Sequence, residues 1–482
     1  MSRPAAGHGK VRPDRSLARV APRVWVGGAP LRLFRVTDRG DAVLAELLAA
    51  GGAGRGAGRG ARRGAGREDE AAVAGLLDRL ILTGAAHPVP AGGGDRSPGR
   101  GEVTVVVPVR DRAGGLPEVL GALGGGTAGV VVVDDGSRDP DAVVVAARAH
   151  GASVVRHDRP RGPAGARNAG LAAVRTELVA FVDSDVVCAR GWLEPLLALL
   201  ADPRVALVAP RVRSTGGSGL LAGYEAEHSP LDLGPDPAPV RPRSRVPYVP
   251  AAALVGRAPA LRELGGFDES LRFGEDVDLV WRLGEAGHLV RYEPAALVHH
   301  QPRPDWPGWA AQRFAYGSSA AELDRRHPGA VAPVVCSGWS AAAWALAASG
   351  SPVLGAVLGA GSAVALARKL PDVPPMAAAS LALRGHLGAG RQLARAVVRP
   401  WWPVALAAAA VSPGARRVAA AALAGRLLGG HDPVAHRFVA LADDAAYGAG
   451  VWWGAWRARR PGPLLPAFPA WPPTQPPTQT PF

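Results

Sequence analysis

Lysine and cysteine are almost absent from this chain of 482 residues. Lys10 and Lys369 are its only lysines and arginine supplies the other basic residues, while glycine (63) and proline (46) are abundant. This bias is typical of GC-rich coding sequence and weakens any functional interpretation of composition. The two cysteines, Cys188 and Cys336, lie far apart without CxxC spacing, so we predict neither a disulfide framework nor a zinc site and expect a reducing compartment.

Aromatic residues are also scarce, at 5% of the chain. The net charge of +14 would suit nucleic acid, but the arginines are scattered and no base-stacking or helix-turn-helix signature accompanies them, so we expect no nucleic-acid partner. A polyanionic small substrate or an anionic membrane surface fits this charge equally well. Residues 1–10 contain no apolar stretch, and we expect no secretory signal peptide.

The length predicts two or three folding units rather than one core. The first, at 1–100, is expected to be a small α+β module that ends in a linker. Its strand patterns and helical spacings fall at 24–28, 31–36, 43–48 and 71–82. The tract 51–67 is almost entirely Gly, Ala and Arg and is expected to be a mobile loop. We interpret the module as winged-helix-like or peptide-recognising; a packing appendage is the alternative.

Residues 101–302 contain apolar runs that predict buried strands, separated by helical stretches. The runs lie at 103–108, 130–133, 153–155 and 179–182. This alternation predicts a doubly wound α/β sheet, in which ligands bind beyond the carboxyl ends of the strands. Charged groups follow three of these runs, as Arg110-Asp111, Asp134-Asp135 and Asp183-Ser184-Asp185. We therefore expect these groups to converge on one edge.

The pair Asp183 and Asp185 is the most informative of these groups. Two carboxylates at a strand end repel one another unless a positive charge lies between them, and a hard cation with oxygen ligands, Mg²⁺ or Mn²⁺, would supply it. A helix cap or a solvated turn is the alternative for an isolated Asp-x-Asp. The neighbouring strand ends favour the metal site.

The order of the motifs resembles the family 2 glycosyltransferases with the GT-A fold. The matching segments are Val-Val-Val-Pro-Val-Arg at 105–110, Val-Asp-Asp-Gly-Ser at 133–137, Gly-Ala-Arg-Asn-Ala-Gly at 165–170, Phe-Val-Asp-Ser-Asp at 181–185, Gly-Gly-Phe-Asp-Glu at 265–269, Gly-Glu-Asp-Val-Asp-Leu at 274–279 and the histidine pair at 299–300. The resemblance implies transfer of a sugar from a nucleotide diphosphate donor. The chain lacks a Gln-x-x-Arg-Trp motif, which argues against a processive cellulose- or hyaluronan-type synthase.

The resemblance also assigns residues to the donor and the metal. Donor-binding candidates are Pro108, Arg110, Asp111, Asp134, Asp135, Arg167 and Ser184. Asp111 and Asp135 would accept from uracil and ribose, unless they cap a following helix. Arg167 would offer a guanidinium fork to the diphosphate, with a salt bridge as the alternative. Metal candidates are Asp183, Asp185 and His300, although His300 could equally be a structural histidine.

The acidic segment before 277–285 supplies the candidate base. In the family the matching aspartate is the base, so we predict that Asp276 takes the proton from the acceptor hydroxyl. Glu275 would support the geometry, and Asp278 is the second candidate. Capping of the helix by these acids is the alternative. Attack opposite the leaving group would invert the anomeric centre in one displacement.

The region 303–460 is expected to be helical and apolar. The stretch 338–367 carries no charge, and 401–411 begins with a tryptophan pair and is bounded by Arg416-Arg417. We expect membrane association, peripheral or through 338–367, at the cytoplasmic face; an Ala-rich helical hairpin is the alternative. The tail at 461–482 is rich in proline and is expected to be disordered.

The three-part layout resembles the glycosyltransferases of mycofactocin biosynthesis in actinobacteria. That resemblance implies β-linked glucose, with UDP-glucose as donor, added to a small peptide-derived precursor of a redox cofactor that the first module could hold. Two alternatives remain open. One is a cell-envelope enzyme that adds rhamnosyl or galactofuranosyl units to a lipid-linked glycan, and the other is a non-catalytic peptide-binding scaffold.

Overall fold

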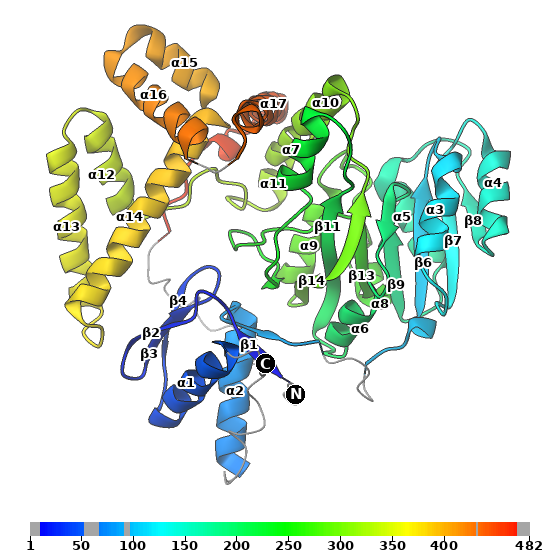
Figure 1. The fold of residues 1–482 in the computed structure, drawn as a ribbon, viewed down its shortest axis with the longest axis horizontal. Helices are drawn as coiled ribbons and strands as arrows, with labels where there is room; N and C mark the ends of the chain where they lie inside the picture. The colour runs from blue at the N-terminus through cyan, green and yellow to red at the C-terminus, as the bar shows by residue number, and fades with distance from the viewer. Residues whose placement is uncertain (1–9, 53–66, 91–96, 430–431, 470–482) are drawn as a thin grey trace. The chain divides into compact units, whose positions relative to one another are not determined.

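The computed structural model describes residues 10–52, 67–90, 97–429 and 432–469. The chain forms two compact units, one made of Met1–Ala86 with Pro307–Phe482 and the other of His87–Trp306. Each is described by itself below, with the elements labelled in Figure 1.

The unit at His87–Trp306 is built on a nine-stranded mixed sheet (Figure 1). The strands are β6 (Val103–Val109), β7 (Gly129–Asp134), β8 (Ser153–Arg156), β9 (Leu178–Val182), β10 (Val186–Cys188), β11 (Val205–Ser214), β12 (Ala238–Pro239), β13 (Ala253–Arg257) and β14 (Leu289–His300). Their order is β10-β14-β11-β13-β9-β6-β7-β8, with β12 beside β14. β9, β6, β7 and β8 are parallel, whereas β13 runs antiparallel to both β9 and β11. The predicted parallel strands are confirmed, and an antiparallel strand at the centre extends the sheet.

Strand β14 is the longest strand of this sheet. It pairs with β11 over most of its length, with a shift in register after Pro210 and Glu293. Prolines are tolerated in strands mainly at edges and bulges, and here Pro210 and Pro294 lie at the same irregularity. The two prolines therefore obscure a continuous strand pair.

Helices cover this sheet. They are α3 (Leu116–Ala122), α4 (Pro140–Ala149), α5 (Gly162–Ala173), α6 (Glu194–Leu200), α7 (Leu220–His228), α8 (Ala258–Glu263) and α9 (Glu275–Glu285), with 3-10 turns η1 (Arg100–Glu102) and η2 (Ala113–Gly115). The motif at 165–170 lies inside α5. Gly170 lets α5 approach β6 closely, because a Cβ at this position would overlap the side chain of Val106.

The first part of the other unit is a small α+β module. Its elements are β1 (Val11–Pro13), β2 (Ala18–Ala21), β3 (Val24–Gly27), β4 (Arg32–Arg35), α1 (Asp38–Gly52), α2 (Arg67–Thr83) and β5 (Ala86–Pro88). The predicted hairpin, β3 with β4, is confirmed, and β2 completes an antiparallel sheet. Buried Trp25 packs with Leu44 and Leu80 of the two helices. Most of the Gly/Ala/Arg tract, residues 53–66, lies outside the described residues.

The second part of this unit is helical. Its elements are α10 (Trp306–Ser318), α11 (Ala320–Arg326), α12 (Gly338–Ala348), α13 (Pro352–Lys369), α14 (Pro375–Val398), α15 (Trp402–Val411), α16 (Pro413–Leu428), α17 (Val434–Ala458) and η3 (Gly462–Leu464). Within the described ranges, no helix combines the length and apolarity that a membrane crossing requires, and this includes α12 and α13, which cover 338–367.

Two contacts within this unit join parts far apart in sequence. Val24 of the small module packs with Leu370, Val373 and Ala378 at the start of α14. Downstream, Ala467 pairs with Val335 in an isolated bridge. Residues 462–467 are thus ordered, in contrast to the disorder expected from 461 onward, while 470–482 lie outside the described residues.

Candidate active site

The loops after β6 and β7 are tied together by Asp111. This residue has a left-handed backbone (φ +55°), its N–H donates to Ser137 Oγ (2.9 Å), and its Oδ1 accepts from the Arg138 N–H (2.8 Å). A non-glycine residue holds such a conformation only where its surroundings impose it. The side chains of Asp111 and Arg110 remain 36% and 56% exposed, so both can meet a ligand. Pro108 lies one position before the end of β6.

Asp134 and Asp135 are both buried, and both accept hydrogen bonds from neighbouring segments of the protein. Asp134 accepts from the Ser137 N–H (2.9 Å) and from Arg156 Nη1 (2.7 Å). Asp135 accepts from His157 Nδ1, from the Arg161 N–H and from the Gly162 N–H, each at 2.8 Å. Asp135 thereby receives the first N–H groups of α5, the helix that carries Arg167. The structure thus gives both carboxylates structural partners, so neither depends on a nucleotide for its hydrogen bonds.

The segment Asp183–Asp185 forms the tight turn between β9 and β10. The Val186 N–H closes it on the Asp183 carbonyl (3.0 Å), with Ser184 in the middle. Desolvation at the strand end raises the pKa of the Asp183 carboxyl, with Arg167 opposing and Asp185 adding to the rise. The side chain nevertheless keeps 29% exposure. The pKa of this carboxyl is therefore raised mainly because the strand end removes it from water, and the neighbouring Asp185 adds to the effect.

Arg167 lies beneath this turn and connects it to α9. Its Nη2 donates to Asp183 Oδ1 (2.7 Å), its Nη1 donates to Glu275 Oε1 (2.9 Å), and its guanidinium stacks over Phe267 (5.4 Å). The side chain is 4% exposed. Both terminal nitrogens donate to carboxylates, so these ion pairs compete with the diphosphate contact expected from the sequence. Arg167 instead joins the Asp-x-Asp turn to the acidic start of α9.

The acids at the start of α9 differ in their surroundings. Burial raises the pKa of Glu275 to about 7, with a contribution from neighbouring Asp276 and opposition from Arg167. Asp276 is only partly buried, and its carboxylate accepts from the Ala251 N–H (3.0 Å) and the Val277 N–H (2.8 Å). Asp278 is fully buried and pairs with Arg282 (2.6 Å). Two backbone donors thus orient Asp276, whereas Asp278 is closed off from a substrate.

His300 ends β14 opposite Val186, the residue that follows the turn. Its Nε2 lies 3.8 Å from Asp185 Oδ2, and Arg112 Nη1 reaches the same oxygen at 2.9 Å. His299 pairs with Val187 one position earlier, so the two histidines point to opposite faces of the sheet. His300 is therefore the histidine beside the aspartates.

Two carboxylates and an imidazole suit Mg²⁺ or Mn²⁺ by donor type. Among the described residues, however, Asp183, Asp185 and His300 do not close into one three-ligand cluster. Arg167 holds Asp183 and Arg112 holds Asp185. The residues present fit the cation in their chemistry, and closing the site requires these side chains to turn toward one another.

Three residues of the site were not predicted from the sequence. Arg112 follows β6, and Arg156 and His157 stand at the carboxyl end of β8, where each pairs with an acid already singled out. Position after a strand identifies the acids and would have identified Arg156 and His157 by the same rule. Trp281 of α9 is buried and donates to the Pro247 carbonyl (2.7 Å), so it is a core residue.

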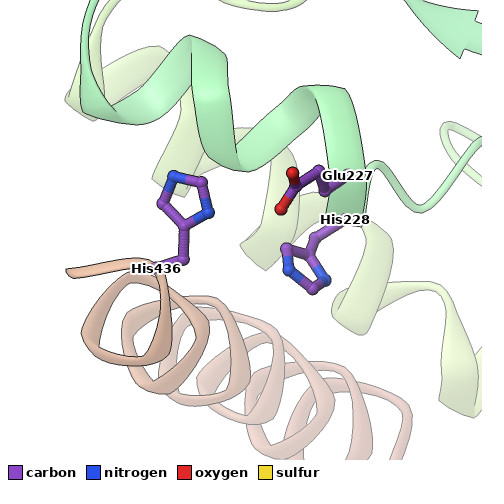
Figure 2. Close-up of side chains that lie close together, drawn as sticks. All are labelled: Glu227, His228 and His436. Carbon is purple, nitrogen blue, oxygen red and sulfur yellow. The ribbon is translucent and has the colours of Figure 1, made fainter. Parts of the chain in front are cut away.

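Other potential metal ligands occur outside this site. Figure 2 shows Glu227 and His228 at the end of α7, with His436 of α17. His228 stacks on Tyr224 of its own helix, with ring centroids 4.8 Å apart. His436 belongs to the other unit, and we assign no site to this group.

The chain is similar to several known proteins. Residues 104–256 match the family model described as glycosyl transferase family 2. The chain is 44% identical over 464 residues to the pre-mycofactocin glycosyltransferase of Mycobacterium tuberculosis, covering 92% of this chain and 93% of the relative. An uncharacterized glycosyltransferase of the same species is 37% identical over 189 residues, covering 39% and 81%. Among solved structures, a mannosyltransferase from Pyrobaculum calidifontis in complex with GDP-Man and Mn²⁺ is 19% identical, with a TM-score of 0.45 over 77% of this chain and 91% of that one.

Proposed function

The chain belongs to the family 2 glycosyltransferases, and we propose that it transfers glucose, in β linkage, from UDP-glucose to a hydroxyl of a peptide-derived redox-cofactor precursor. The observation that carries this proposal is the similarity to the pre-mycofactocin glycosyltransferase over 92% of the chain, far beyond residues 104–256. A shared length of this extent includes parts of the small module and the helical region. We propose that the small module holds the acceptor or a partner protein.

Asp183, Asp185 and His300 would hold Mg²⁺ or Mn²⁺ beside the donor phosphates. When bound, the cation neutralises charge on the departing diphosphate. Arg112 faces the same place, and its 39% exposed side chain can turn from Asp185 to a phosphate oxygen once a cation takes that carboxylate. Asp111 and Arg110 remain the exposed candidates for the nucleotide, and Asp134 and Asp135 would support them through the loops they tie.

Asp276 would take the proton from the acceptor hydroxyl. Its carboxylate is partly exposed and oriented by two backbone N–H groups, and these bonds leave lone pairs for an acceptor. Glu275 would position the helix start through Arg167 rather than react itself. Attack on the face opposite the diphosphate would invert the anomeric centre in a single displacement, with no covalent intermediate.

Turnover of UDP-glucose by the purified full-length protein with Mn²⁺ and candidate acceptors tests this function. We expect glucosylation of the peptide-derived acceptor, loss of about 10²–10⁴-fold in kcat in Asp276→Asn, and retained UDP binding in that variant. Asp278→Asn is the comparison for the second candidate base. It removes a buried structural partner, so its loss should appear in stability and not as a base-specific change in the pH profile of kcat.

Three outcomes would contradict the proposal. Transfer of rhamnose or galactofuranose to a lipid-linked glycan, with no glucosylation, would favour a cell-envelope enzyme. Absence of turnover with every donor would favour a scaffold. Unchanged Mn²⁺ affinity in both Asp183→Ala and Asp185→Ala, measured by calorimetry, would contradict the proposed metal ligands whatever the activity.

We further propose that the helical region contacts a membrane surface.

A further inference from the structure

Helix α15 is apolar around its whole circumference, and half of its residues are exposed. None of its ten residues, all of them described, is buried, and none is charged. The side chains of Val404, Leu406 and Val411 are 54%, 62% and 84% exposed. A helix that is hydrophobic all round ordinarily lies in a protein core or against lipid. The face of α15 therefore requires a cover that the described chain does not provide.

A groove of about 900 Å³ runs beside this helix, within the same unit. Its lining is mostly apolar and comes from the turn after α12, the end of α14, α15, α16 and α17. Ala348, Val397 and Ala405 are among the lining residues, and Trp401 and Trp452 contribute indole rings. A groove of this volume has room for the end of a hydrocarbon chain beside α15.

The charge of the surrounding residues indicates which kind of partner could bind the exposed apolar surface of α15. Residues 338–429 contain nine basic residues and a single acid, Asp372. Arg416 and Arg417 are exposed on the first turn of α16, and Arg417 lines the groove. A second copy of the chain would bring the same positive surface against this one, whereas an anionic surface would be attracted.

We propose that α15, the groove and the pair Arg416–Arg417 form a docking surface for an anionic phospholipid bilayer. The helix lies in the plane of the interface with its apolar residues among the acyl chains, the groove takes the end of a chain, and the two guanidinium groups bind lipid phosphates. Arg416 also donates to the Ala409 carbonyl of α15 (3.2 Å), which keeps the arginine pair beside the apolar helix. This inference rests on the proposed membrane contact and is independent of the sugar donor.

Sedimentation of the full-length protein with vesicles tests the surface. We expect binding to vesicles of phosphatidylcholine mixed with phosphatidylglycerol, weak binding to phosphatidylcholine alone, and release by salt. Val404→Glu with Leu406→Glu, and separately Arg416→Glu with Arg417→Glu, should each weaken binding at least about tenfold. Arg416→Lys with Arg417→Lys keeps the charge and should bind. Val145→Glu, at an exposed apolar position on α4, is the matched control and should bind as the parent does.

Several results would overturn the proposal. The first is absence of sedimentation with anionic vesicles, and the second is binding by both glutamate double variants as tight as that of the parent protein. The third is a dimer in analytical ultracentrifugation that Val404→Glu with Leu406→Glu dissociates. Should that variant fail to fold by circular dichroism, the exposed arginine pair decides the question. Glucosyl transfer to a soluble acceptor is measured on the same samples. Absence of glucosyl transfer together with normal vesicle binding would contradict the proposed reaction but not the proposed docking surface.

Discussion

Arg167 is the residue on which the geometry of the site most depends. It is buried and bridges Asp183 and Glu275, so Arg167→Gln leaves two carboxylates without their shared partner. We expect this change to lower the free energy of unfolding of the transferase unit by about 3–5 kcal/mol. Arg161→Gln is the control, because its ion pair with Glu269 is exposed and should contribute less than about 1 kcal/mol. Equal losses in urea unfolding would contradict the central role of Arg167.

Glu275 predicts a pH dependence of stability. Its pKa is raised to about 7 by burial and by Asp276, so between about pH 4.5 and 7 the folded protein holds a proton that the unfolded chain has released. Stability therefore falls as pH rises through this window, by on the order of 1–3 kcal/mol. Glu275→Gln mimics the protonated form and should remove this contribution. Unfolding midpoints at pH 5, 6 and 7 measure it, with exposed Glu269→Gln as the control, and an unchanged slope in Glu275→Gln would refute it.

The carboxylates of the site could be predicted from the sequence, and their cationic partners could not. Asp111, Asp134 and Asp183 each follow an apolar run, so strand position alone identifies them. Arginine supplies all but two of the 55 basic residues, and a single arginine in such a chain carries little information. The pairing of Arg112 with Asp185 and the burial of Arg167 depend on contacts between distant segments, which only the fold brings together.

At the scale of elements, a strand whose apolar run is unbroken, or has a proline only near its end, is predictable, and a strand pair with prolines at an internal bulge is not. β6, β7, β8 and β9 follow from their apolar runs, and their order in the sheet agrees with the predicted α/β alternation. The strand pair β11 and β14 contains Pro210 and Pro294 at one bulge, where the usual rule argues against a central strand. The neighbouring β13 restores regular pairing, so the sheet tolerates this break.

The contact of α5 with β6 makes a prediction at Gly170. A Cβ at this position would overlap Val106, so Gly170→Ala should destabilise the unit by about 1–3 kcal/mol. Gly121→Ala on α3 meets open space and should instead stabilise by about 0.5–1 kcal/mol through helix propensity. Val106→Ala combined with Gly170→Ala should recover part of the loss in denaturant unfolding. Additive losses in the double variant would show that the overlap is not the cause.

At the scale of the whole molecule, the glycine-rich composition has a structural use in the helical region. Gly317, Gly450 and Gly454 lie where α10 and α17 approach so closely that a Cβ on any of them would overlap the backbone of the other helix. The stretch 338–367 does not form one long helix. It is divided at Gly350, which has a positive φ of 97°, into the two helices α12 and α13. Composition alone suggests a continuous apolar segment, and the turn residues within it decide otherwise.

The helical region is held by a buried ion network, and this gives the last prediction. Asp444 of α17 accepts from Arg399 (2.6 Å) and from Arg426 of α16 (2.8 Å) and is 2% exposed. Asp444→Ala leaves Arg426 without this anion and should destabilise the unit that contains it by about 3–5 kcal/mol. Asp372→Asn is the control, because its ion pair with Arg35 is exposed on both sides, and it should cost less than about 1 kcal/mol.

Calorimetry of both variants measures these costs, and UDP binding with Mn²⁺ serves as the second readout. Because every partner of Asp444 lies within its own unit, UDP affinity should be the same in Asp444→Ala as in the parent. A fall in UDP affinity that parallels the loss of stability would mean that the network supports the donor site as well as the helices. In that case the helical region would contribute to donor binding as well as to its own stability.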